Sequence, residues 1–167
     1  MFNVIVLHEK GLSPDDTWYP WLKKELEKRD ANVYFPTFSG DDYTGDWRNK
    51  IKEYLKFMDE NSMIIGHGEG IKIALKILET KSRTIAGTFL VAGHLDNEQF
   101  DFDNIKMKSD EFFVYASGDD HKVPASKTEH LAAMVGETPL IIPDAKHFDE
   151  ITEFEDILID IISVIDR

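Results

Sequence analysis

The chain has 167 residues, 42% of them hydrophobic, a formal net charge of -13 at pH 7 and no cysteine. This length and apolar content suit one folded domain over residues 1–167 and argue against disorder. The acidic surface repels phosphate backbones and anionic lipids, so we expect neither nucleic acid nor a membrane as partner. The absence of cysteine excludes disulfides, thiolate catalysis and thiolate metal sites.

The N-terminal segment from Met1 to Leu7 lacks the basic region and cleavage site of a signal peptide. No apolar run in the sequence approaches membrane-spanning length. We therefore expect a cytoplasmic protein.

Short apolar runs alternate with amphipathic helical patterns along the chain. Strands are predicted at 3–7, 32–35, 62–65, 85–91, 111–115 and 139–142. Helical stripes cover 18–26, 47–58, 71–78, 125–135 and 151–165. Residues 91–109 show no clear pattern, which predicts a loop or a very small cap. The alternation predicts an α/β fold with three α/β/α layers and a mainly parallel sheet of about six strands.

Alternate glycines lie between the third strand and the third helix, in the order Gly66-His67-Gly68-Glu69-Gly70. This is the frame of the Gly-x-Ser-x-Gly nucleophile elbow, in which the central residue lies on a strained turn between strand and helix. Gly68 takes the place of the serine. The alternative is a generic glycine-rich turn that binds a phosphate at the helix N-terminus, although Glu69 would repel a phosphate.

Two polar segments follow later strands. Asp119 and Asp120 come after the fifth strand, just before Val123 and Pro124, and His147 comes after the sixth strand. Elbow, acid and histidine occur in the order found in Ser-His-Asp hydrolases of this architecture. Taken singly, the aspartates also fit a turn with a helix cap, and His147 fits an ordinary loop histidine.

With these residues, the sequence resembles the small serine hydrolases typified by the retinoblastoma-binding serine hydrolase and its YdeN-like bacterial relatives, over nearly the whole chain. The segments that carry the resemblance, besides the elbow, are His8-Glu9-Lys10-Gly11, Trp18-Tyr19-Pro20-Trp21-Leu22, Val33-Tyr34-Phe35-Pro36, Asp119-Asp120 before Val123-Pro124, and His147-Phe148. The aromatic string beginning at Trp18 is the most specific of them.

The resemblance implies a minimal α/β-hydrolase fold and an ester- or amide-cleaving ancestor that needs no metal or organic cofactor. By position, His147 would be the base, Asp120 would orient it, and Gly68 would mark the nucleophile position. The backbone N–H of Glu69 would be one oxyanion-hole donor and that of Glu9 the second.

The sequence departs from the family pattern at two positions. Gly68 has no hydroxyl, so no acyl-enzyme can form there. Glu9 replaces a residue that is normally the glycine of a His-Gly pair, and its carboxylate would oppose an oxyanion unless the side chain pointed away. These departures predict a catalytically impaired hydrolase, a pseudoenzyme or binding scaffold for a small-molecule ester or amide or for a protein ligand. No feature of the sequence indicates an oligomeric state.

Two alternatives stay open at this stage. In the first, the protein is an active hydrolase in which His147 and Asp120 activate water, or in which Ser13 or Ser117 is the nucleophile. In the second, it is an inactivated variant of an ordinary serine hydrolase. His94 and Asp96 fit loop interactions better than a metal site, so no metal is predicted.

Overall fold

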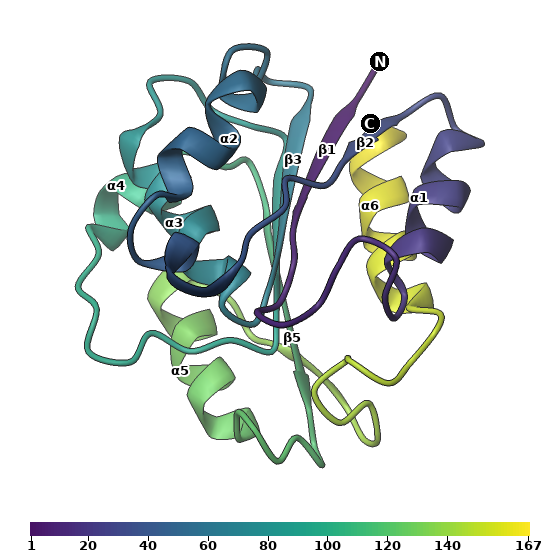
Figure 1. Ribbon diagram of the computed structural model, residues 1–167, viewed down its shortest axis with the longest axis vertical. Coiled ribbons are helices and arrows are strands. Elements are labelled where there is room, and N and C mark those ends of the chain that lie inside the picture. Colours follow the sequence, from purple (N-terminus) through teal and green to yellow (C-terminus); the bar gives the residue numbers. More distant parts are fainter.

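The computed structural model describes residues 1–167 and contains one six-stranded, fully parallel sheet (Figure 1). The strand order is β2-β1-β3-β4-β5-β6. The strands are β1 (Asn3–Leu7), β2 (Asn32–Tyr34), β3 (Ser62–His67), β4 (Gly87–Val91), β5 (Phe112–Ser117) and β6 (Leu140–Ile142). The helices are α1 (Tyr19–Glu27), α2 (Trp47–Leu55), α3 (Gly70–Thr80), α4 (Phe102–Lys106), α5 (Ala125–Val135) and α6 (Glu155–Ile165), with a 3-10 turn η1 (Gly40–Tyr43).

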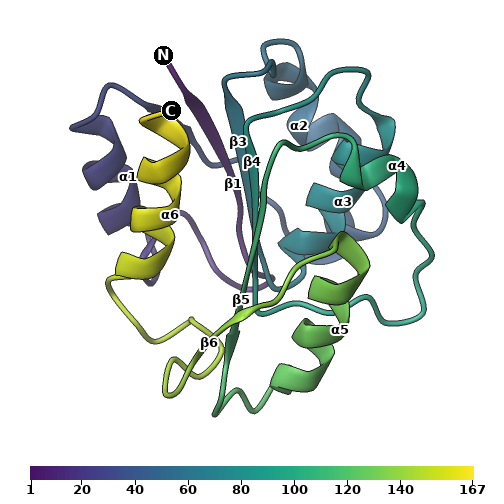
Figure 2. The ribbon, with the colours of Figure 1, turned by 180° about the vertical axis from the view of Figure 1, so that it is seen from behind.

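Helices cover both faces of the sheet, as the predicted three-layer fold requires. Helices α1 and α6 lie on one face, and α2, α3, α4 and α5 lie on the other (Figure 2). Each face has its own apolar core, one containing Leu22 and Ile157 and the other Ile51, Leu75 and Leu131. Strands β3 and β4 are buried along their whole length, which explains why their sequences are almost continuously apolar.

The fold class is confirmed, and the differences concern element ends and short elements. The patternless stretch 91–109 contains the five-residue helix α4, whose N-cap Asp101 accepts a hydrogen bond from the N–H of Asn104 at 3.1 Å. Helix α6 begins at Glu155 and not at Ile151, and the hydroxyl of Thr17 lies 2.6 Å from the carbonyl of Ile151. No helix in the structure is both long enough and apolar enough to traverse a bilayer.

The parallel arrangement gathers the loops of interest at one edge of the sheet. The loops after β1, β3, β5 and β6 carry Glu9, Gly68, Asp120 and His147, and all four leave the carboxyl ends of their strands. This edge is the lower end of the sheet in Figure 1. Ligand sites of open parallel sheets form at such an edge.

Gly70, the first residue of α3, packs directly on the backbone of β1. A Cβ at Gly70 would overlap the carbonyl of Leu7, and backbone atoms cannot move aside cheaply. We expect Gly70→Ala to lower the free energy of unfolding by about 3 kcal/mol or more. Gly11→Ala is the matched control, because Gly11 has a φ of +86° but open space around it; its cost should be only about 1–2 kcal/mol. Urea denaturation of both variants measures the difference, and equal losses would contradict this close packing of strand and helix.

Candidate active site

The chain turns sharply between β3 and α3, with Gly68 at the corner. Gly68 has a φ of +56°, in the left-handed region that favours glycine. Its N–H donates to the carbonyl of Val91 at 2.8 Å, and its carbonyl accepts from the N–H of Ile71 at 3.1 Å. This is the geometry expected of an elbow, with the central residue facing the loops at the sheet edge.

Asp120 and His147 meet beside this corner. The Nδ1 atom of His147 lies 2.9 Å from Oδ2 of Asp120, and both side chains are 1% exposed. The other oxygen of Asp120 accepts the backbone N–H groups of Lys122 and Val123, each at 2.9 Å. The carboxylate therefore fixes the orientation of the imidazole, as the sequence predicts for an acid–histidine pair.

The side chain of Glu9 points into the site. Its Oε2 forms a very short contact with Nε2 of His147. A Cβ built on Gly68 would overlap the carboxyl group of Glu9. The carboxylate therefore fills the space that the side chain of a residue at position 68 would need, and the idea that Glu9 points away from the site is wrong.

Two backbone N–H groups converge on the other oxygen of this carboxylate. Oε1 of Glu9 accepts from the N–H of Glu69 at 3.0 Å and from the N–H of Lys10 at 2.6 Å. The N–H of Glu69, one of the two expected donors, therefore points into the site, whereas the N–H of Glu9 donates to the hydroxyl of Tyr19 at 3.0 Å. In the first loop it is the N–H of Lys10 that points into the site. Which N–H of that loop does so depends on the local backbone direction, which the residue types there do not fix.

A chain of buried hydrogen bonds connects two loops of the site. Nε2 of His67 lies 2.8 Å from the carbonyl of His147, which can only accept, so Nε2 carries the proton. Nδ1 of His67 must then accept from the hydroxyl of Tyr19 at 2.7 Å, and Tyr19 in turn accepts from the N–H of Glu9. His67 thereby connects the loop of Glu9 to the loop of His147.

The aromatic string holds the histidine loop as well. The carbonyl of Phe148 accepts from Nε1 of Trp18 at 3.0 Å, and the hydroxyl of Thr17 lies 2.9 Å from the same carbonyl. Lys146 and Phe148, on either side of His147, have φ values of +50° and +58°. Such left-handed residues persist only where surrounding contacts determine them, so Trp18 positions the loop in addition to packing in the core.

Charge in the site is concentrated on Glu9 and His147. Burial alone would raise the pKa of Glu9, but its hydrogen bonds with His147 and the N–H of Glu69 lower it. Burial alone would lower the pKa of His147, but hydrogen bonds to Glu9 and Asp120 raise it. Both shifts favour an ion pair between the Glu9 carboxylate and the His147 imidazolium.

The two serines considered as substitute nucleophiles form no hydrogen bond with His147. Ser117 is 1% exposed, accepts from the N–H of Ala145 at 2.9 Å and donates to Asp119 at 2.8 Å. Ser13 accepts from the N–H of Asp15 at 3.3 Å within its own turn. Both hydroxyls stabilise turns, and Nε2 of His147 contacts Glu9 instead.

A second polar cluster lies at the start of α3. Glu69, His94 and Asp96 offer ligand atoms within 4.8 Å of one another. The ammonium group of Lys72, whose side chain is 7% exposed, lies 3.0 Å from Glu69 and 2.6 Å from Asp96. A cationic side chain of the protein thus already lies against both carboxylates of this cluster.

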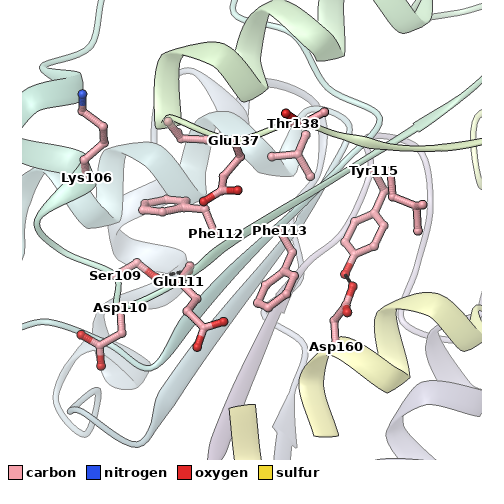
Figure 3. Close-up of a pocket in the computed structure, with 13 residues that line it drawn as sticks. Lys106, Ser109, Asp110, Glu111, Phe112, Phe113, Tyr115, Glu137, Thr138 and Asp160 are labelled. Carbon is pink, nitrogen blue, oxygen red and sulfur yellow. Dashed lines mark hydrogen bonds between the residues drawn. The ribbon is translucent and has the colours of Figure 1, made fainter. Parts of the chain in front are cut away.

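A hollow elsewhere on the surface lies beside the first half of β5 (Figure 3). Strand β6 pairs only with the second half of β5, from Tyr115 onward, so Phe112 and Phe113 have no strand on that side. Two of the polar side chains that line the hollow, Tyr115 and Asp160, hydrogen-bond to each other at 2.6 Å. This hollow contains none of the elbow, acid or histidine residues.

The fold and the elbow–acid–histidine geometry together are those of an α/β hydrolase. A family model described as serine hydrolase matches residues 4–158, and the chain therefore belongs to the serine hydrolase family. It is 25% identical over 164 residues to YdeN of Bacillus subtilis (strain 168), covering 89% of this chain and 86% of YdeN.

Solved structures show the same fold. The crystal structure of the ydeN gene product superimposes with a TM-score of 0.93 at 22% identity over the full length of both chains. The Pyrococcus furiosus esterase Pf2001 has a TM-score of 0.73 at 14% identity, over 99% of this chain and 82% of that one. XC6422 of Xanthomonas campestris, described as an α/β serine hydrolase without lid, has a TM-score of 0.71 at 14% identity, over 99% and 81%.

The buried His67 makes the fold sensitive to acid. Burial lowers the pKa of His67 to about 4, whereas an unfolded histidine titrates near 6.5. Between these values the unfolded chain binds a proton that the native state does not, so native stability falls as the pH drops, by up to about 3 kcal/mol.

The variant His67→Gln keeps one donor and one acceptor but has no titrating group. We expect the stability advantage of the wild type over this variant to shrink by up to about 3 kcal/mol between pH 7 and pH 4. Denaturant titrations at several pH values measure it, with the exposed His130→Gln as control. A constant difference across this range would show that His67 is not held neutral.

Proposed function

We propose that this protein is a serine hydrolase family member in which the family's serine-based cleavage of esters and amides is impaired. The observation that carries the proposal is the Glu9 carboxylate, which fills the side-chain space above Gly68 and contacts His147. Gly68 supplies no hydroxyl for His147 to activate. For that chemistry the protein is a pseudoenzyme.

The occupied oxyanion hole supports the same conclusion. Acyl transfer needs free N–H donors where negative charge develops on the substrate oxygen. Here the N–H groups of Glu69 and Lys10 already bind Oε1 of Glu9. An acyl substrate would have to displace a carboxylate held by both N–H groups and by an imidazolium.

The paired nature of the two departures argues against simple inactivation of an ordinary serine hydrolase. If only the elbow serine had been replaced by glycine, position 9 in the first loop would still hold the family's usual glycine. In this chain the carboxylate of Glu9 occupies the space that Gly68 leaves free. We therefore treat both residues as parts of one arrangement, retained in a cytoplasmic scaffold that binds a small-molecule ester or amide or a protein ligand.

The proposed loss of serine-based chemistry can be tested with a serine-directed fluorophosphonate probe. Wild type should remain unlabelled because no activated hydroxyl faces His147. Gly68→Ser should also remain unlabelled and should lose stability, since its Cβ overlaps the Glu9 carboxyl group and its φ of +56° costs a non-glycine residue about 1 kcal/mol or more.

The double variant Glu9→Gly with Gly68→Ser should regain labelling at position 68. Adding His147→Ala to the double variant should slow labelling by about 10²–10⁴-fold, the usual contribution of a general base. Mass spectrometry of the peptides measures labelling in all four proteins, which are wild type, Gly68→Ser, the double variant and the double variant with His147→Ala. Stoichiometric labelling of the wild type, or equal labelling of the single and double variants, would overturn the proposal.

A further inference from the structure

We propose that Glu9 is itself a nucleophile, which accepts an alkyl group from a small primary alkyl halide to form an ester that His147 and water then hydrolyse. The inference rests on the proposed function only in requiring that the serine route be closed. It assigns to the site a substrate class, R–CH₂–X with a halide leaving group, and a reaction at a saturated carbon.

The position of Glu9 supports this role. Its carboxylate lies beside the imidazole of His147 at the place where the elbow frame puts a nucleophile. The Glu9 side chain is 11% exposed, whereas those of His147 and Asp120 are 1% exposed. Of these three side chains, that of Glu9 is the most exposed.

The two backbone N–H donors indicate that the carbon that becomes tetrahedral is Cδ of Glu9. Because the N–H groups of Glu69 and Lys10 point at Oε1 of Glu9, they can stabilise negative charge on that oxygen. Charge develops there when water adds to an ester of Glu9. Displacement of a halide from a saturated carbon forms that ester without any oxyanion on the substrate, so the donors are needed only in the second step.

The first step makes one bond and breaks one. Oε2 of Glu9 attacks the CH₂ carbon, and the C–X bond breaks with its electron pair leaving on the halide ion. The resulting alkyl ester is neutral. Loss of the Glu9 charge removes part of what keeps the proton on His147, so the imidazole releases that proton to solvent and becomes a base.

The second step regenerates the site. A water oxygen adds to Cδ of Glu9 while its proton moves to Nε2 of His147, and the new oxyanion on Oε1 accepts from Glu69 and Lys10. The bond between Cδ and the alkyl oxygen then breaks, and the leaving alkoxide takes the proton from His147. The carboxylic acid of Glu9 passes its proton to His147, so the net reaction is R–CH₂–X + H₂O → R–CH₂–OH + H⁺ + X⁻.

The experiment traps the ester. Wild type and His147→Gln are each incubated with 1-bromobutane, 2-bromoethanol and bromoacetamide, and the chain has no cysteine to react instead. His147→Gln should accumulate one alkyl group per chain on the Glu9 peptide, removable by hydroxylamine, because ester hydrolysis slows by about 10²–10⁴-fold without the base. Wild type in H₂¹⁸O should release bromide and acquire ¹⁸O in the carboxylate of Glu9.

Two further variants complete the test. Glu9→Gln should lose both the label and the bromide release, whereas Glu98→Gln should keep them, since Glu98 is a partly buried carboxylate paired with Lys76 at 3.7 Å. The proposal is overturned if no bromide alkylates Glu9 in His147→Gln and no ¹⁸O enters Glu9 in the wild type. The wild-type ¹⁸O measurement decides even if His147→Gln does not fold. Fluorophosphonate labelling at position 68 fails or succeeds independently of this result.

Discussion

One small volume between Gly68 and His147 determines the character of the site. It can hold the side chain of residue 68 or the carboxylate of Glu9, but not both, because a Cβ on Gly68 would overlap that carboxyl group. The carboxylate gains three polar contacts there, with His147 and with the N–H groups of Glu69 and Lys10. A buried charge is tolerated only when it is paired and hydrogen-bonded in this way. The absence of a side chain at position 68 is therefore a structural requirement of the Glu9–His147 pair.

Hydrogen bonds to backbone groups hold the loops of Glu9 and His147 in position. The chain from the N–H of Glu9 through Tyr19 and His67 to the carbonyl of His147 joins the two loops that carry the charged partners. Every donor in that chain has one acceptor, so reversing any member would leave a buried polar group without a partner. Trp18 adds a second tie from α1's N-terminal end to the histidine loop. The aromatic string that begins at Trp18 thus contributes to the geometry of the candidate site as well as to the core.

Sequence patterns predicted the sheet, its helices and the meeting of Gly68, Asp120 and His147, because parallel strands bring their carboxyl ends to one edge whatever the loops contain. They did not predict the direction of the Glu9 side chain, which depends on contacts between residues 9, 68 and 147 far apart in the chain. They also missed Lys10 as a donor, because a backbone N–H carries no residue identity. The short helix α4 was missed because five residues cannot show a helical period.

The Glu9–His147 pair also changes which reaction the backbone N–H donors beside the elbow can accelerate. Only interactions stronger in the transition state than in the ground state increase a rate. For acyl transfer to a serine, the donors of Glu69 and Lys10 would have to be free in the ground state, and here they already bind a full negative charge. For an ester of Glu9, the same donors face a neutral carbonyl that becomes an oxyanion when water adds. In the proposed reaction the same hydrogen bonds would favour hydrolysis of an ester of Glu9, whereas they oppose acyl transfer to a serine, because only in the first case is the carbonyl oxygen part of Glu9.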